Sequence, residues 1–216
     1  MMKEKAMKIH ICNDNKVFPF LYVDNWYSPT EEKLIWRELD FYTYRQDTSV
    51  FHRAEKTNVP GRRKDGISKT KAWRLYLDPI YARRDVSNIM RLQPLKMRSI
   101  KMKKAINQAG PSFRMFEMTN MDITQINYYE DEDHYESHVD NYMMTIFCWL
   151  HRKPKGYTGG DITFTDTNVT VKCEHNRLVM FPSFYRHEVQ PIKMNDKNSV
   201  IGAGRYCIVN FYVTKR

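Results

Sequence analysis

The second half of this 216-residue chain is a succession of short β-rich runs separated by turn residues. Seven such runs follow Phe113, at residues 121–129, 143–150, 160–165, 168–173, 177–182, 186–190 and 204–213. Regularly spaced short strands joined by short loops are typical of a β-sandwich or jelly roll. This pattern limits the fold more than any other feature, and it predicts a two-sheet β core over residues 113–216.

The first half, residues 1–112, is predicted to supply further strands and supporting helices. Ser28-Pro29-Thr30-Glu31 has the form of a capping box with proline at the first helical position, and it predicts a helix to about Leu39. The remaining expectations are strands at 8–12, 18–24 and 73–77, a long polar loop at 52–70, and one or two helices over 85–107 broken near Pro94. The expected fold class is α+β, mainly β.

Composition places the chain among globular proteins, with 42% hydrophobic and 28% charged residues. No apolar run approaches the length of a membrane helix, and no apolar region follows the charged N-terminus as in a secretory signal. The four cysteines form no C-x-x-C pair, which argues against a disulfide framework or a zinc site. We therefore expect one domain over residues 1–216, located in the reducing environment of the cytoplasm.

The net charge of +10 is unevenly distributed along the chain. Residues 111–216 hold 12 basic and 13 acidic side chains, whereas residues 51–104 alone hold 16 basic and 4 acidic. A basic segment before a neutral half is compatible with a surface for nucleic acid or an acidic protein. It is equally compatible with a solvated helical face, and the sequence leaves both interpretations open.

Two histidines and one aspartate have the spacing of a metal site. His138 and Asp140 are two residues apart, so on a β-strand they point to the same face, and His187 would come from a second strand alongside. Two imidazoles and a carboxylate are the facial triad that holds non-haem Fe(II) with open coordination positions. A lone H-x-D is common by chance, so the surrounding residues decide its meaning.

Arg205 opens a strand that is otherwise apolar at alternate positions, where a buried guanidinium would need an anion. The sequences around these four residues are His138-Val139-Asp140-Asn141, His187-Glu188-Val189-Gln190-Pro191 and Arg205-Tyr206-Cys207-Ile208. Together they resemble the 2-oxoglutarate/Fe(II)-dependent dioxygenases of the prolyl 4-hydroxylase branch, with the nearest likeness to the oxygen-sensing prolyl hydroxylases. Residues 20–32 and 77–84 are also similar to the corresponding parts of other hydroxylases, including bacterial and phage members.

The resemblance implies a double-stranded β-helix, a cupin-like jelly roll, with Fe(II), 2-oxoglutarate and O₂ as reactants and ascorbate as a reductant. It implies that His138, Asp140 and His187 bind the metal and that Arg205 binds the distal carboxylate of 2-oxoglutarate. It further implies co-substrate contacts by Tyr128, Thr145 and Trp149, and substrate contacts by Tyr135 and Asn141. For the two tyrosines, a role as packing aromatics fits nearly as well, because the chain contains 14 tyrosines.

One departure from the family concerns the distance between His187 and Arg205. The gap is 18 residues, where the family usually has nine or ten, so residues 192–204 are expected to form an enlarged loop. Loops at the edge of a site often tune substrate choice. The departure therefore bears on the identity of the substrate more than on that of the cofactor.

The expected activity is hydroxylation of a prolyl residue in a protein, coupled to conversion of 2-oxoglutarate to succinate and CO₂. Hydroxylation of another residue or of a free amino acid is one alternative. Oxidative demethylation of a nucleobase, served by the basic 51–104 segment, is another. A non-catalytic binding module is disfavoured, because all three ligands and Arg205 are present. The sequence leaves the oligomeric state open.

Overall fold

The computed structural model describes residues 6–13, 18–44, 50–57, 61–196 and 202–215. Its centre is an eight-stranded antiparallel sheet in the order β1-β2-β12-β8-β15-β6-β5-β3. Its strands are β1 (Lys8–Cys12), β2 (Phe20–Asp24), β3 (His52–Arg53), β5 (Trp73–Tyr76), β6 (Met121–Tyr129), β8 (Met144–Leu150), β12 (Arg177–Pro182) and β15 (Arg205–Val213). The first-half strands thus extend both edges of the sheet formed by the second half.

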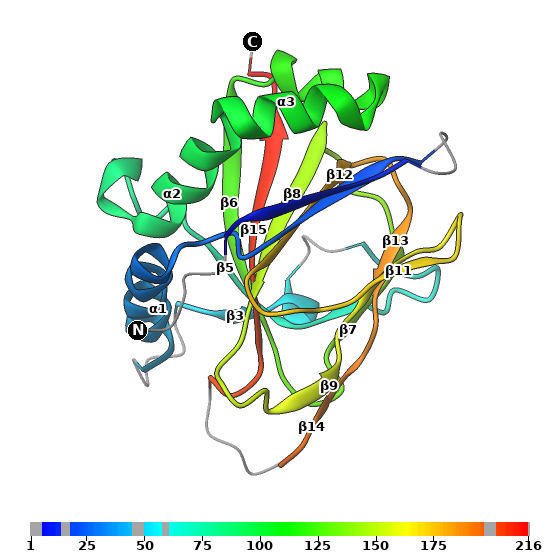
Figure 1. Ribbon diagram of the computed structural model, residues 1–216. Helices are drawn as coiled ribbons and strands as arrows, with labels where there is room; N and C mark the ends of the chain where they lie inside the picture. Colours follow the sequence, from blue (N-terminus) through cyan, green and yellow to red (C-terminus); the bar gives the residue numbers. More distant parts are fainter. Residues whose placement is uncertain (1–5, 14–17, 45–49, 58–60, 197–201, 216) are drawn as a thin grey trace.

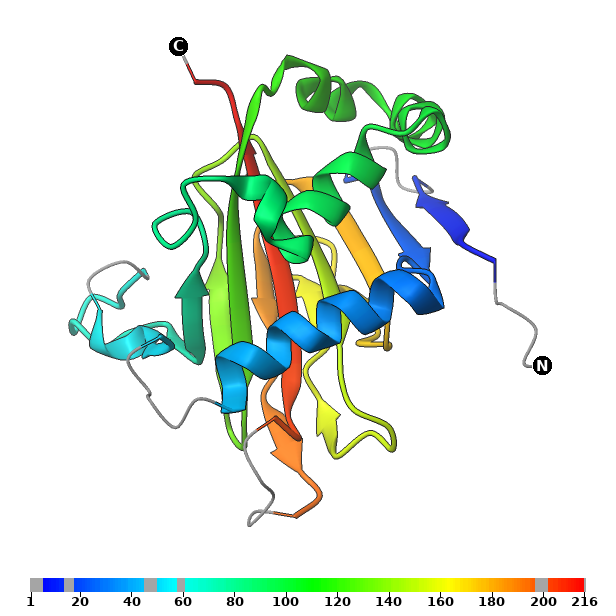
Figure 2. The same ribbon diagram turned by 90° about the vertical axis from the view of Figure 1, so that its left-hand side faces the viewer.

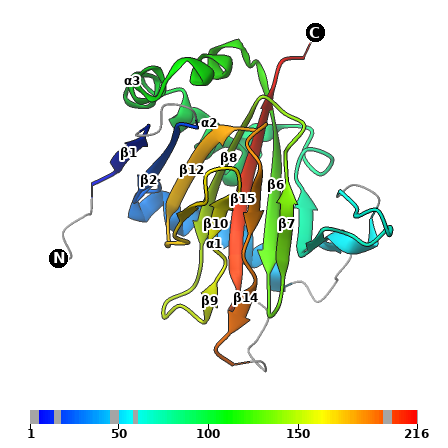
Figure 3. The ribbon, with the colours of Figure 1, turned by 90° about the vertical axis from the view of Figure 1, so that its right-hand side faces the viewer.

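A five-stranded sheet in the order β11-β10-β13-β7-β4 packs against the large sheet (Figure 1). Its strands are β4 (Thr70–Lys71), β7 (His134–His138), β10 (Ile162–Phe164), β11 (Val169–Val171) and β13 (His187–Val189). A further pair, β9 (Tyr157–Gly159) and β14 (Ile192–Met194), lies at the end of the molecule away from α3 (Figure 3). The jelly roll expected from the sequence is confirmed.

Helices cover the outer face of the large sheet. They are α1 (Pro29–Tyr44), α2 (Asn88–Met97) and α3 (Ile100–Ala109), with the 3₁₀ helices η2 (Arg84–Val86) and η3 (Pro111–Met118). The 3₁₀ turn η1 (Ala54–Lys56) instead lies next to β4 of the small sheet. Figure 2 shows α1 lying across this face, with α2 and α3 beyond it. None of the helices in the described ranges is long and apolar enough to cross a membrane.

The large sheet has an apolar core on each of its two faces. Because side chains alternate along a strand, Ile126, Cys148 and Ile208 pack beneath the helices. Phe147, Trp149 and other neighbours point the other way, into the space between the two sheets. Every residue of β8 is buried, which explains why this central strand reads as a continuous apolar run rather than an alternating one.

The capping box at the start of α1 is confirmed. The backbone N–H of Ser28 donates to Glu31 Oε2 at 2.8 Å, and the backbone N–H of Glu31 donates to Ser28 Oγ at 3.3 Å. The helix continues five residues beyond the expected end at Leu39. Its continuation has no strong stop signal, and Leu39 and Tyr42 are both buried against the sheet.

Two helices occupy the predicted region, but the break between them lies beyond Pro94. Pro94 lies inside α2, which ends at Met97, and Ser99 caps α3 by accepting a hydrogen bond from Met102 N–H. A proline removes one helical hydrogen bond, but the carbonyl of Pro94 still accepts from Arg98 N–H at 3.2 Å. Burial of Leu92 and Met97 on either side keeps this turn helical.

The expectation of a long loop over residues 52–70 was also wrong for its described parts. This stretch contains β3, η1 and a bridge between Arg62 and Ser68, and β4 begins at Thr70. Residues 58–60 lie outside the described ranges. Likewise, the start of the predicted 192–204 loop is strand β14, paired with β9, and residues 197–201 of that prediction are not described.

Candidate metal centre and co-substrate cavity

The two histidines face each other across neighbouring strands of the small sheet. His138 ends β7 and His187 begins β13, and the two residues are direct partners in the antiparallel pairing. The Nδ1 of His138 lies 2.7 Å from the carbonyl of Glu136, and that of His187 lies 2.8 Å from the carbonyl of Tyr185. A carbonyl can only accept, so both rings carry their proton on Nδ1 and present a free Nε2 lone pair.

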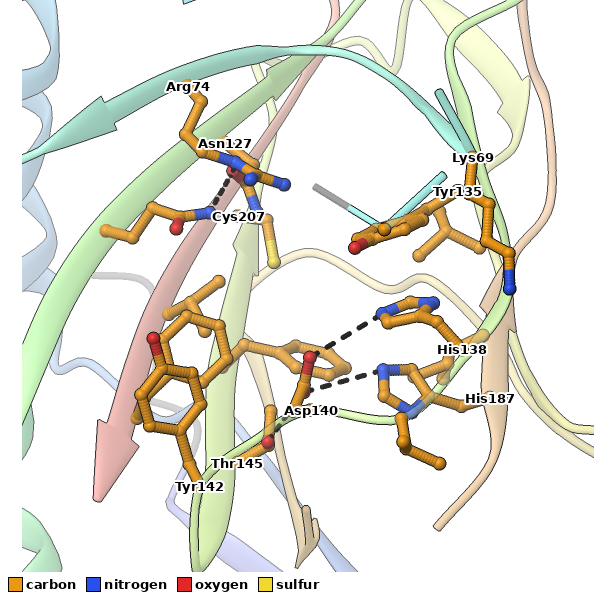
Figure 4. Close-up of a pocket in the computed structure, with 18 of the residues that line it drawn as sticks. Lys69, Arg74, Asn127, Tyr135, His138, Asp140, Tyr142, Thr145, His187 and Cys207 are labelled. Atoms are coloured by element: carbon orange, nitrogen blue, oxygen red, sulfur yellow. Dashed lines mark hydrogen bonds and ion pairs between the residues drawn. The ribbon is translucent and has the colours of Figure 1, made fainter. Parts of the chain in front are cut away.

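Both Nε2 atoms converge on Asp140. The His138 Nε2 lies 3.6 Å from Asp140 Oδ1, and the His187 Nε2 lies 3.7 Å from Asp140 Oδ2. One ligand atom from each residue can be chosen so that all lie within 4.8 Å of one another. Figure 4 shows the three side chains pointing into the same cavity. These three donors fit a divalent transition metal, whose coordination sphere they would occupy on one face.

Burial prepares His138 to bind a metal ion. Desolvation, reinforced by the neighbouring His187, lowers the pKa of His138 to about 2. The ring is therefore neutral, as a metal ligand must be, and no proton has to leave before a cation binds.

Asp140 is not on the strand that carries His138, contrary to the expectation that one short strand supplies both ligands. β7 ends at His138, and Asp140 lies in the following loop. Its backbone N–H donates to the carbonyl of Ser183 at 3.0 Å, and its Oδ2 accepts from Thr145 Oγ1 at 2.7 Å. The loop is thus fixed by β8 and by the turn after β12 rather than by sheet pairing.

The cavity in front of the three residues has a volume of about 330 Å³ and lies between the two sheets. Its walls come from β5, β6, β8 and β15 on one side and from β7 and β13 on the other (Figure 4). Of the residues predicted to act in the site, Asn141, Tyr135, Thr145, Trp149 and Arg205 all line it with the triad. Tyr135 stacks on His138, with ring centroids 3.5 Å apart.

Arg205 lies at the deep end of the cavity and is only 1% exposed. One terminal nitrogen donates to the carbonyl of Gly160, and the guanidinium lies 4.0 Å above the ring of Tyr129. Its Nε is buried without a hydrogen-bond partner among the described residues. A buried guanidinium with an unused donor beside a cavity fits a bound carboxylate.

Gly160 allows this placement of Arg205. Its φ is +76°, and a Cβ at this position would lie 2.5 Å from Ile192 Cδ1 and 3.3 Å from Arg205 Cδ. Any larger residue would therefore collide with the wall that supports the guanidinium. The glycine therefore serves backbone geometry.

Tyr128 does not line the cavity, contrary to the expectation from its spacing to His138. Its ring packs in the core beneath the helices, and its hydroxyl accepts the backbone N–H groups of Gly202 and Gly204 at 2.7 and 3.1 Å. The next residue, Tyr129, lines the cavity and lies under Arg205. The alternation of side chains on β6 decides between the two neighbouring tyrosines.

Thr145 lines the cavity, but its hydroxyl is already engaged. It donates to Asp140 Oδ2 and lies 2.8 Å from Ser183 Oγ. The threonine therefore orients a candidate metal ligand, which differs from the expected direct contact with the co-substrate.

The cavity residues missed from the sequence include Tyr129 and the polar residues Arg74, Gln125, Asn127 and Cys207. Gln125 and Asn127 precede Tyr129 at intervals of two on β6, so the period of a strand would have placed them on the same face. Arg74 gave no signal, because it lies among many basic residues and its strand pairs with β6 from a distance of about fifty residues.

Six of the sixteen basic residues of the segment 51–104 form ion pairs within the described fold. Arg53 binds both carboxylate oxygens of Asp133, at 3.0 and 2.8 Å. The other ion pairs of this segment include Arg63 with Glu136, Lys71 with Glu132, Arg83 with Asp85, Arg84 with Asp78 and Asp122, and Lys96 with Glu31. Part of the charge of the segment therefore serves internal contacts, three of them with the acidic run 130–136.

The jelly roll brings two imidazoles, one carboxylate and a buried arginine together in one internal cavity, and this donor set fits a mononuclear non-haem metal centre. Residues 124–213 match the family model of the 2OG-Fe(II) oxygenase superfamily. No sequence among curated proteins matches the chain.

Solved structures share the fold. A prolyl-4-hydroxylase of Pseudomonas putida is 18% identical, with a TM-score of 0.56 over 94% of this chain and 97% of that chain. A prolyl hydroxylase of Trichoplax adhaerens, solved with a hypoxia-inducible-factor peptide, is 17% identical, with a TM-score of 0.58 over 90% and 83%. NgTET1, solved with 5mC DNA, is 14% identical, with a TM-score of 0.52 over 91% and 72%. At these identities the likeness is one of fold.

Proposed function

We propose that this 2OG-Fe(II) oxygenase hydroxylates a prolyl residue of a protein substrate. The observation that supports a dioxygenase most directly is the placement of His138, Asp140 and His187 in one cavity with the buried Arg205. The prolyl substrate is favoured by the sequences around these residues and by the two prolyl hydroxylases of the same fold.

In this proposal, the Nε2 atoms of His138 and His187 and one oxygen of Asp140 hold Fe(II). Bound iron supplies the reaction with O₂, in which 2-oxoglutarate becomes succinate and CO₂ and one oxygen atom enters a C–H bond of the substrate. Three protein ligands on one face leave positions for the co-substrate and for O₂. The carboxylate of Asp140 also offsets part of the metal charge inside the cavity.

Arg205 is proposed to bind the distal carboxylate of 2-oxoglutarate. Its planar fork matches a carboxylate, and the apolar walls formed by Trp149 and Ile162 exclude water that would weaken the ion pair. Tyr129 below the guanidinium fixes its orientation. At the metal end, Tyr135 and Asn141 are proposed to contact the substrate.

We also propose that residues 1–216 act as a single domain. Strands of both halves share the large sheet, and α1, α2 and α3 bury their apolar faces on strands of the catalytic half. Residues 113–216 would then be the catalytic core and residues 1–112 its support.

The test is succinate formation by anaerobically purified full-length protein supplied with Fe(II), 2-oxoglutarate, ascorbate and O₂. We expect slow succinate formation without substrate, and faster formation with a proline-containing protein or peptide. Asp140→Ala is expected to lose turnover and keep the fold, as measured by circular dichroism. Equal succinate formation in Asp140→Ala would contradict the ligand assignment.

The competing function in the same fold is oxidation of a nucleobase, as NgTET1 was solved with 5mC DNA. A base must be flipped out and its phosphates held by free cations. The ion pairs of Arg53, Arg63 and Lys71 leave fewer free cations near the cavity than the sequence suggested. Stimulation by methylated DNA and not by peptides would reverse this preference.

A further inference from the structure

Two arginines of the described chain are nearly buried, and both line the same cavity. Arg205 is 1% exposed and Arg74 is 8% exposed. Within the part of the chain that the structure describes, neither has a carboxylate within ion-pair distance. By contrast, less buried arginines such as Arg53 and Arg177 pair with Asp133 and Asp24. In the proposed function, the distal carboxylate of 2-oxoglutarate neutralises Arg205. No anion has yet been assigned to Arg74.

Arg74 projects from β5 into the side of the cavity away from Asp140. It pairs in register with Asn127, which pairs with Cys207, which in turn pairs with Trp149. Figure 4 shows its guanidinium directed toward Tyr135, on the far side of the cavity from Asp140 and Thr145. The position is therefore close to where the substrate would approach the metal.

The guanidinium of Arg74 is held but not neutralised. Its Nε donates to Asn127 Oδ1 at 3.4 Å, and the same oxygen also accepts a hydrogen bond from Gln125 Nε2. These groups fix the orientation of the arginine without supplying a negative charge. A guanidinium has more N–H donors than these contacts use, so it can still offer the hydrogen bonds that a carboxylate receives from arginine.

The charges around the cavity leave room for another anion. Its lining includes the cations Lys69, Arg74, Arg186 and Arg205, and the anion Asp140. Fe(II) would add two positive charges. The two carboxylates of 2-oxoglutarate are accounted for, one at the metal and one at Arg205. Arg74 is then a buried cation that no part of the proposed cofactor set neutralises.

We propose that Arg74 binds a carboxylate of the substrate, so that the hydroxylated residue lies beside an acidic group. This inference rests on the proposed function and narrows its substrate class. The carboxylate has two sources of the same chemistry. It is either the side chain of an acidic residue next to the target proline in a peptide, or the α-carboxylate of free proline.

A carboxylate is favoured over the phosphates of a nucleic acid by the surroundings of Arg74. The phosphate backbone of a nucleic acid is bound by several unpaired Lys and Arg side chains on the protein surface. Here Arg53, Arg63 and Lys71, which belong to the same basic segment as Arg74, are paired with Asp133, Glu136 and Glu132. Arg74 itself is a buried, oriented guanidinium, which suits a single planar anion.

The experiment compares acids with their neutral isosteres, using the Fe(II)-loaded full chain and succinate as the readout. The first pair is a blocked peptide with Asp next to proline and the same peptide with Asn. The second pair is free L-proline and L-prolinamide. We expect the acid of at least one pair to stimulate succinate formation at least ten-fold more than its amide. Which pair responds identifies the source of the carboxylate.

Arg74→Gln is expected to reduce this acid-to-amide ratio to less than two-fold, because the variant binds the acid more weakly and its Michaelis constant rises. The Michaelis constant for the co-substrate should change much less than it does in Arg205→Gln. Arg74→Lys, which keeps the charge but loses the fork, should give an intermediate ratio. The matched control is Arg83→Gln, because Arg83 pairs with Asp85 on the surface.

Three results would overturn the inference while leaving the dioxygenase intact. They are succinate formation that no acid probe raises above its amide, a co-substrate Michaelis constant raised equally in Arg74→Gln and Arg205→Gln, and stimulation by single-stranded DNA alone. If the wild type forms no succinate and does not bind 2-oxoglutarate, the proposed function itself fails. A melting curve for each variant separates loss of binding from loss of fold.

Discussion

The hydroxyl of Thr145 holds the carboxylate of Asp140. Thr145 Oγ1 donates to Asp140 Oδ2 at 2.7 Å. Thr145 Oγ1 also lies 2.8 Å from Ser183 Oγ. Asp140 lies outside any strand, so these contacts and one backbone hydrogen bond to Ser183 position the third candidate ligand. The geometry of the metal centre therefore depends on a residue that binds no metal.

Replacing Thr145 with valine should weaken metal binding and preserve the fold. Partners that orient metal ligands typically account for about 10–100-fold in affinity, and we expect a loss in this range. Titration with Mn(II), which does not react with O₂ in the assay, measures the dissociation constant. Thr170→Val, a similar change on an exposed part of β11, serves as the control. Unchanged affinity in Thr145→Val would show that the loop holds Asp140 unaided.

Arg205→Ala should impair binding of 2-oxoglutarate far more than binding of Mn(II). Removing one partner of a buried charge pair costs about 2–5 kcal/mol, which corresponds to at least a roughly 30-fold rise in the dissociation constant. Calorimetric titration of the Mn(II)-loaded protein under argon gives both constants. Equal 2-oxoglutarate affinity in wild type and variant would place the carboxylate elsewhere in the cavity.

Tyr128→Phe should destabilise the protein although Tyr128 lies outside the cavity. Its hydroxyl accepts two backbone N–H groups, from Gly202 and Gly204, and these donors would lose their partner. An unsatisfied buried donor costs about 1–3 kcal/mol, which urea unfolding would detect. The 2-oxoglutarate affinity should change little. A large loss of affinity without a loss of stability would instead assign Tyr128 to the co-substrate.

Glu31→Gln should lower stability at neutral pH, with an effect that fades in acid. Burial opposes ionisation of Glu31, but hydrogen bonds from Lys96 and Ser28 outweigh it and lower the pKa of this carboxyl from 4.5. The ionised carboxylate therefore stabilises the native state above pH 4.5, and this contribution is lost as the pH falls through the lowered native pKa.

We expect a difference of about 0.5–1 kcal/mol in the free energy of unfolding at pH 7, since Glu31 is partly exposed. Urea unfolding from pH 7 down to pH 3.5 should show the difference shrinking. Ser28→Ala removes the other half of the capping box without removing a titrating group, so its deficit should persist over the same range. A constant difference for Glu31→Gln would mean that its charge is not involved.

The local pattern was sufficient wherever neighbours along the chain decide the structure. The strands of the jelly roll, the capping box of α1 and the pairing of His138 with His187 follow from periodicity, turn residues and spacing. The choice between Tyr128 and Tyr129 did not follow, because it depends on the phase of β6 relative to the cavity. That phase is set by the pairing of β6 with β15 and β5.

Long-range charge pairing was also invisible in the sequence. Arg53 and Asp133 are eighty residues apart, yet they form a two-point hydrogen-bonded pair. Without that contact, a polar and basic stretch at 52–70 looks like a loop or a binding surface. Arg74 was missed for the same reason, because only the pairing of β5 with β6 brings it to the cavity.

The pairing of the basic segment with the acidic run 130–136 limits how this protein can be recombined with its relatives. The matched family region begins at residue 124, after β5, so a graft of that region alone would leave Asp133 and Glu136 without Arg53 and Arg63. It would also remove the wall that carries Arg74. A functional chimera would therefore need residues 52–76 from the same parent as the catalytic strands. Residues 52–76 and 130–136 must be exchanged together, although they are far apart in the sequence.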